Sequence, residues 1–184
     1  LKDFPMIYRD IEIPYCMSLG DMVYAILSAF HSNGTHLYMV KFKKENYYCF
    51  ADPYVDGEIA DLHYLCDMKL RKNSQLTVWY DFGCDYYFDV KVMEIKTNNN
   101  IFNPQDMTIL DGNGYGIWED GHDLLSLYLS NPESFYEYIE DAGYDEAYFP
   151  IHEEFDKEES CQFFYENYQL IKVGYMPLDE EDEV

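Results

Sequence analysis

Six acidic and histidine side chains near turns of the chain have the composition of a divalent-cation site. They are His36, Asp81, Asp85, Glu119, Asp120 and His122. Imidazole nitrogens and carboxylate oxygens are common ligands of such ions, and paired carboxylates can also carry out acid–base chemistry. Ordinary roles stay open as well, because aspartates in turns accept backbone N–H bonds and acidic residues before a helix interact with its dipole. If the side chains act together, we expect them to meet at one edge of a sheet.

The tripeptide Asp81-Phe82-Gly83 matches the magnesium-binding motif of protein kinases, but the rest of a kinase is missing. A kinase also needs a glycine-rich loop, a strand lysine and a catalytic-loop Asp and Asn. The sequence has no G-x-G-x-x-G, no H-R-D and no G-x-x-x-x-G-K-[ST]. This argues against phosphoryl transfer and predicts that Asp81 and Gly83 form a tight turn between two strands.

Apolar spacing predicts the elements that would position these side chains. Strands are expected at 6–15, 36–42, 46–51, 75–82 and 86–95, and helices at 18–34, 58–66, 122–131 and 132–143. Ser18 is expected to cap the first helix. Residues 107–121 carry four glycines and are expected to be irregular, and 160–175 fit either a strand or a helix.

This order predicts an α+β fold with a mostly antiparallel sheet, a β-α-β-β start, a central hairpin and C-terminal helices. We expect a core domain at 1–143 and an acidic C-terminal extension at 144–184, with a mobile end. The chain has 184 residues, which is enough for one hydrophobic core.

The charge is strongly negative and uneven. Twelve Lys and Arg residues stand against 36 Asp and Glu, for a net charge of −24, and 133–184 alone carry 17 acidic and two basic residues, or −15. Such a field repels phosphate backbones and disfavours direct nucleic-acid binding. It suits a solvated surface, cation attraction or docking to a basic protein.

Cysteine usage and hydropathy favour a cytoplasmic protein. The five cysteines are odd in number and widely spaced, without a zinc or C-x-x-C pattern, which predicts free thiols in a reducing compartment. No apolar run reaches the roughly 18 residues of a membrane span, and the first residues show no signal-peptide hydrophobic region.

Three separated segments resemble the family named for the third open reading frame of an Ri-type plasmid, whose members are also labelled transposon passenger or resolvase-like proteins. The segments are IPYCMSLGDMVYAILSAFHSNGTHLYMVKF, YDFGCDYYFDVKVMEI and LDGNGYGIWEDGHDLLSLYL. Together they place the likeness at about 6–130 and imply an association with mobile elements. The resemblance names no activity.

The chain departs from the hallmark Y-D-F-G-D-x-W-x-H that the resemblance implies. Cys84, Tyr86 and Phe88 stand in place of its Asp, Trp and His, and Ile117-Trp118 replace a proline pair. If family members use that Asp and His for chemistry or metal, this chain has lost both.

We therefore predict a non-enzymatic protein-interaction module that docks a protein with a basic surface through its acidic C-terminal third, with tyrosines and Trp118 as anchors. One version is a nucleic-acid mimic. The alternatives are a degenerate metal-dependent enzyme built on His36, Asp81, Asp85 and Glu119, or a small-molecule module with 112–121 as its mouth. The candidate binding residues are His36, Asp81, Asp85, Trp118, Glu119 and Asp120. No catalytic residue, metal ligand or cofactor is assigned, and oligomeric state is left open.

Overall fold

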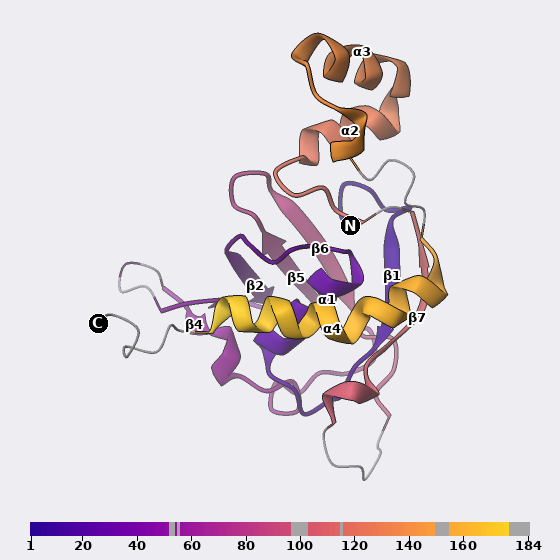
Figure 1. Ribbon diagram of the computed structural model, residues 1–184. Helices are drawn as coiled ribbons and strands as arrows, with labels where there is room; N and C mark the ends of the chain where they lie inside the picture. The colour runs from indigo at the N-terminus through magenta and orange to yellow at the C-terminus, as the bar shows by residue number, and fades with distance from the viewer. Residues whose placement is uncertain (52–53, 55, 97–102, 115, 150–154, 177–184) are drawn as a thin grey trace, which may run out of the picture.

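The computed structural model describes residues 1–51, 54, 56–96, 103–114, 116–149 and 155–176 (Figure 1). Its strands are β1 (Tyr8–Glu12), β2 (Tyr38–Phe42), β3 (Glu45–Tyr48), β4 (Glu58–Ile59), β5 (Gln75–Tyr80), β6 (Tyr86–Lys91) and β7 (Thr108–Asn113). Its α-helices are α1 (Leu19–Ala29), α2 (His122–Ser130), α3 (Pro132–Ala142) and α4 (Lys157–Tyr175), and its 3-10 helices are η1 (Ala60–Leu62), η2 (Pro104–Asp106) and η3 (Glu146–Tyr148). The fold is α+β, as the sequence predicted.

The larger sheet is mostly antiparallel and has the strand order β4-β3-β2-β5-β6. The predicted hairpins β2–β3 and β5–β6 are both present. Alternate residues of β2, β5 and β6 are buried on one face, as period-two strands with one covered face require. This face is rich in aromatic residues and forms one wall of the core.

Helix α1 is the centre of the molecule, and all of its residues are buried. It lies between the larger sheet and α4 (Figure 1), which explains why it is apolar around its whole circumference. Ser18 caps it as predicted: its hydroxyl accepts from the Asp21 N–H at 2.9 Å, and the Asp21 carboxylate accepts from the Ser18 N–H at 3.4 Å. This reciprocal pair is a capping box.

Strands β1 and β7 form a separate two-stranded antiparallel sheet. The expectation that 107–121 are irregular is therefore wrong for Thr108–Asn113. The glycines that suggested a loop serve the pairing instead. A Cβ on Gly112 would lie 2.8 Å from Arg9 Cδ and 2.9 Å from the Phe155 ring, so the missing side chain makes room for both.

Residues 157–175 of the predicted extension form a helix that packs on the core. The N-terminal half of α4 contacts β7, where Cys161 Sγ donates to the Ile109 carbonyl at 3.4 Å. The helix also covers α1 and buries Phe164, Tyr168 and Ile171. The last residues, expected to be mobile, lie outside the described part of the chain.

Helices α2 and α3 pack against each other at one end of the molecule, beyond the larger sheet (Figure 1). Both were predicted, and Gly143 ends α3 with φ of 74°. The predicted helix at 58–66 is reduced to η1, preceded by β4. Among the described residues, no helix combines the length and hydropathy of a membrane span.

Candidate functional site

His36 and Asp81 meet because the strands beside them are neighbours. The β2–β5 register places Tyr38 opposite Tyr80, so the residues before β2 and after β5 share one end of the sheet. The Asp81 N–H donates to the Leu37 carbonyl at 3.0 Å, which extends the pairing. As a result, His36 Nδ1 lies 3.7 Å from Asp81 Oδ1.

Asp81 is a buried turn aspartate with one oxygen left over. It is 3% exposed and has φ of 55°. Its Oδ1 accepts from the N–H groups of Gly83 and Cys84 at 3.1 and 3.2 Å, so the predicted tight turn is confirmed. Its Oδ2 is buried and has no hydrogen-bond partner among the described residues.

Glu119 reaches the same place from the segment between β7 and α2. Its carboxylate accepts from the Ser32 hydroxyl at 2.5 Å, the Asn33 N–H at 2.7 Å and the Tyr80 hydroxyl at 3.0 Å. Burial raises the pKa of Tyr80 and the Glu119 charge raises it further, so Tyr80 remains a hydroxyl donor at neutral pH. Glu119 thus ties the end of α1 to β5.

His36, Asp81 and Asp120 form a compact group of potential ligands, which we call the His36 cluster together with Glu119. The Nε2 atom of His36 lies 3.2 Å from Asp120 Oδ1 and 3.6 Å from Glu119 Oε2. One ligand atom from each of His36, Asp81 and Asp120 lies within 4.8 Å of the others. The Nε2 atom is buried and, like Asp81 Oδ2, makes no hydrogen bond among the described residues. Buried polar atoms without partners are costly and uncommon.

Asp85 and His122 do not belong to this cluster. Asp85 is exposed, has φ of 60°, and accepts a bond from the Tyr87 hydroxyl at 3.4 Å. His122 lies 3.5 Å from an Asp3 carboxylate oxygen. The expected convergence therefore holds for His36, Asp81, Glu119 and Asp120, and it is wrong for the other two. The Asp85 side chain is exposed, and the His122 ring faces Asp3 instead.

Trp118 covers the core and is not an exposed anchor. It is 3% exposed, and its ring packs against three aromatic rings 5.4 to 5.6 Å away, those of Tyr128, Phe135 and Phe149. The use of Trp118 as a docking anchor is thus wrong. Sequence reasoning could not find its partners, because they come from α2, α3 and the segment after η3.

The departures at Cys84, Tyr86 and Phe88 lie in different surroundings. Cys84 is next to Asp81, and burial together with the Asp81 charge raises the pKa of its thiol. Tyr86 donates to the Trp118 carbonyl at 2.8 Å. Phe88 is buried against Phe30 at a ring distance of 5.0 Å. A histidine at position 88 would face the core, so its loss does not remove a ligand from the His36 cluster.

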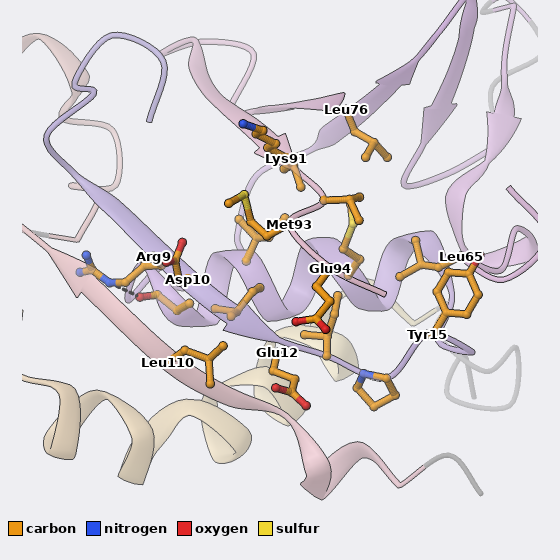
Figure 2. Close-up of a pocket in the computed structure, with 18 of the residues that line it drawn as sticks. Arg9, Asp10, Glu12, Tyr15, Leu65, Leu76, Lys91, Met93, Glu94 and Leu110 are labelled. Atoms are coloured by element: carbon orange, nitrogen blue, oxygen red, sulfur yellow. Dashed lines mark hydrogen bonds between the residues drawn. The ribbon is translucent and has the colours of Figure 1, made fainter. Parts of the chain in front are cut away.

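A cavity of about 900 Å³ lies elsewhere, between β1 and β6 and over α1 (Figure 2). Its walls include Arg9, Asp10 and Glu12 from β1, and apolar residues of α1 such as Met22 and Ile26. Lys96 Nζ, from the segment after β6, lies 2.5 Å from Glu12 Oε2. No described residue of 112–121 lines this cavity, although that segment was expected to form a binding mouth. The sequence gives little indication of this cavity, because the cavity forms where edge strands of two different sheets face each other.

Comparison with solved structures supports the fold. The chain is similar to a protein of unknown function from Methanosarcina mazei Go1, with 17% sequence identity and a TM-score of 0.61, over 84% of this chain and 88% of that one. Among curated proteins, none is similar enough to count as a match.

The match at the level of sequence families extends beyond the three segments discussed above. It covers residues 2–161, from the start of the chain through both sheets and into α4. The stretch includes His36, Asp81, Glu119 and Asp120. This chain belongs to the plasmid pRiA4b ORF-3-like protein family.

Proposed function

We propose that this protein binds a divalent cation through His36, Asp81 and Asp120. One observation carries the proposal: a buried imidazole nitrogen and a buried carboxylate oxygen, both without hydrogen-bond partners, stand beside a third donor. A cation held between these side chains would give unpaired donor atoms a partner and would offset the like charges of the carboxylates around it.

The spacing of the donors suits a small ion. Nitrogen and oxygen ligands lie about 2.0–2.2 Å from zinc and hence roughly 3–4 Å from one another. The observed limit of 4.8 Å closes to this range with small side-chain movements. A mixture of imidazole and carboxylates favours zinc, manganese or iron over calcium.

Glu119 has a supporting role in this proposal. Its three donors, from Ser32, Asn33 and Tyr80, already fix its carboxylate. It therefore adds negative charge beside His36 Nε2 without leaving its own place. Three protein ligands leave a coordination position for water, and a metal-bound water is a nucleophile near neutral pH. Hydrolysis is the reaction class that such a site could support.

The test compares two aspartates of the same turn. We expect zinc or manganese at 100 times its dissociation constant to stabilise the wild-type protein by about 2.7 kcal/mol, which raises Tm by roughly 5–10 °C. Asp81→Asn keeps an oxygen for the Gly83 and Cys84 N–H groups and tolerates positive φ, but it weakens the ion site. This variant should lose most of the shift.

Asp85→Asn is the matched control, because it removes one charge from the same turn outside the cluster. It should keep the full shift in Tm. Metal analysis of protein purified without chelator gives the stoichiometry. Protein with far less than one ion per chain and no thermal shift with either metal would refute the proposal.

A second proposal is that the surface of α3 and η3 docks a protein with a basic surface. From Asn131 to Phe149 the chain has six acidic residues and no Lys or Arg. Four tyrosines of this stretch are exposed, Tyr136, Tyr138, Tyr144 and Tyr148. Exposed aromatics among acidic residues combine contact area with electrostatic attraction to a basic partner.

Within the acidic C-terminal third, this surface is a better place to test docking than the acidic residues at 153–159. Asp156 accepts from the Glu159 N–H at 2.9 Å and caps α4, so reversing its charge would disturb the helix, while 153 and 154 lie outside the described residues. We expect the triple variant Glu137→Lys, Glu140→Lys, Asp141→Lys to lose proteins that the wild type retains from a native extract. The control reverses three exposed acids elsewhere, Glu45, Asp56 and Asp67. Equal loss in both variants would mean that only net charge matters.

A further inference from the structure

Two cysteines that are far apart in the sequence lie close together beside a short antiparallel pairing. The segment before α1 pairs with the segment after η1 through a bridge between Ser18 and Tyr64. Two backbone hydrogen bonds frame this bridge, from Leu65 N to Met17 O at 3.0 Å and from Leu19 N to His63 O at 2.7 Å. Cys16 and Cys66 lie in the turns that flank this bridge, on the same side of it, two residues from Ser18 and from Tyr64.

The two thiols are in contact and accessible. The Cys66 thiol shares a hydrogen bond with Cys16. Cys16 is exposed and Cys66 is half-buried. The bond from Leu65 N to Met17 O, at 3.0 Å, lies directly beside the two cysteines and holds their backbones together. Contact between the thiols is the approach that a disulfide needs, because its Cβ atoms must come within about 3.5–4.5 Å of each other.

We propose that Cys16 and Cys66 form a redox-active dithiol that undergoes thiol–disulfide exchange with a small disulfide of the glutathione class. The Cys16 thiolate attacks one sulfur of the small disulfide and releases one small thiolate. The Cys66 thiolate then attacks the Cys16 sulfur and releases the second. Two electrons pass to the small disulfide, and the two protons lost by the cysteines protonate the leaving thiolates, so two small thiols leave and one protein disulfide forms.

The order of attack follows from the surroundings of the two sulfurs. Burial, the hydrogen bond to Cys16 and the Asp67 charge raise the pKa of Cys66, so Cys66 stays protonated while the exposed Cys16 meets the reagent. Two other cysteines lie in different places. Cys49 is buried and accepts a hydrogen bond from the Tyr38 N–H, and Cys161 contacts the Ile109 carbonyl.

The disulfide would fasten the N-terminal end of α1 and one end of the cavity. Cys16 lines the cavity together with Tyr15 and Leu65, and the last two are drawn at the same end of it (Figure 2). The link would close a long loop between residues 16 and 66. It should raise Tm on the order of 10 °C, because it restricts the unfolded chain.

The test treats the full chain with oxidised glutathione and maps the product by mass spectrometry. We expect the protein to lose two hydrogens and to yield a linked pair of peptides that contain Cys16 and Cys66. Trypsin leaves Cys49 and Cys66 on one peptide, 45–69, so a second cleavage after Glu58 is needed to separate them. Reduction with dithiothreitol should reverse both the mass change and the rise in Tm.

Cys16→Ser and Cys66→Ser should each abolish the product, while Cys161→Ser should retain it. The single variants give a second readout, since Cys66→Ser should accumulate glutathione on Cys16. A wild-type protein that stops at glutathione on Cys16, stays reduced, or links another pair of cysteines would overturn the proposal. None of these outcomes depends on the cation site.

Discussion

Two acidic clusters lie at opposite ends of α1, and they differ in how completely their polar atoms are paired. At the C-terminal end, the His36 cluster leaves a buried nitrogen and a buried oxygen without hydrogen-bond partners among the described residues. At the N-terminal end, Asp21 and Asp61 are surrounded by donors; we call these two residues and their donors the Asp21 cluster. Similar side chains are thus used in two different ways within one core.

The Asp21 cluster joins three separate segments. Asp21 Oδ1 accepts from the Tyr168 hydroxyl at 2.7 Å and from Lys172 Nζ at 2.6 Å, which holds α4 against α1. Asp61 accepts from the Tyr24 hydroxyl at 2.9 Å. Gly20 permits this approach, because a Cβ there would lie 2.0 Å from Asp61 Oδ1.

The difference indicates which cluster serves stability and which serves binding. Removing one partner of a fully paired buried carboxylate strongly lowers the stability of the folded protein. A charged carboxylate with an unpaired oxygen and acidic neighbours already destabilises the folded protein. Removing its charge should therefore cost little until a cation is present.

The largest expected effect is a loss of stability at alkaline pH, which involves both clusters together. Burial raises the pKa of five fully buried tyrosines, Tyr24, Tyr38, Tyr80, Tyr86 and Tyr168. The folded protein therefore keeps protons that the unfolded chain loses above its pKa of about 10. Stability is intact below pH 10 and falls as pH rises above it, by up to about 1.4 kcal/mol per tyrosine at pH 11.

Five such contributions approach the whole stability of a typical domain, about 5–15 kcal/mol. Absorbance of tyrosinate near 295 nm, recorded with circular dichroism, tests this expectation. The buried tyrosines should ionise only together with loss of structure. Smooth titration of all twenty tyrosines with the fold intact would contradict the burial described here.

The next effect separates the two clusters. Asp21→Ala removes the partner of Lys172 and Tyr168 as well as half of the capping box, and it should cost about 3 kcal/mol of unfolding free energy. The matched control is Asp123→Ala, which changes an exposed aspartate in the first turn of α2 and should cost less than about 1 kcal/mol.

Urea unfolding in the presence of chelator measures these values, and Asp81→Asn belongs in the same series. We expect it to cost less than about 1 kcal/mol without metal, in contrast to Asp21→Ala. If Asp81→Asn were as destabilising as Asp21→Ala in metal-free protein, both clusters would be structural, and the comparison would no longer support the cation site.

Much of the fold could be predicted because its signals are local. The Ser18 cap, the apolar spacing of α1 and the turn at Gly83 each lie within a few residues of the structure they determine. The β1–β7 pairing was missed because it joins residues about a hundred positions apart, and because glycines at 112 and 114 suggest a loop. The Cys16–Cys66 contact was missed because the two residues are also far apart in the sequence.

The candidate site was predictable in part. His36 and Asp81 flank strands that the sequence identified, so their meeting follows once those strands are neighbours. Glu119 and Asp120 were included only for their chemistry, since nothing local shows that their segment returns to the end of α1. The prediction that Asp85 joins the site was wrong, because a backbone φ of 60° cannot be read from residue type alone.

The smallest expected effect asks whether the two clusters communicate. Tyr175, near the end of α4, stacks on Tyr24 of the Asp21 cluster at 5.1 Å, and its hydroxyl donates to the His36 carbonyl. Tyr175→Phe keeps the ring and removes only this donor, so it should cost about 1 kcal/mol of stability. Because the bond fixes the backbone of a proposed ligand, cation affinity should fall roughly tenfold.

Tyr165→Phe on the same helix is the matched control, because its ring stacks on Tyr168 and lies away from His36. Calorimetric titration with zinc gives the dissociation constant of each variant. A weaker dissociation constant for Tyr175→Phe alone would mean that α4 positions His36, and that the paired cluster at one end of α1 supports the unpaired one at the other. An unchanged constant with lower stability would confine Tyr175 to packing, and the ion site would then depend only on the β2 and β5 ends and the segment that carries Glu119 and Asp120.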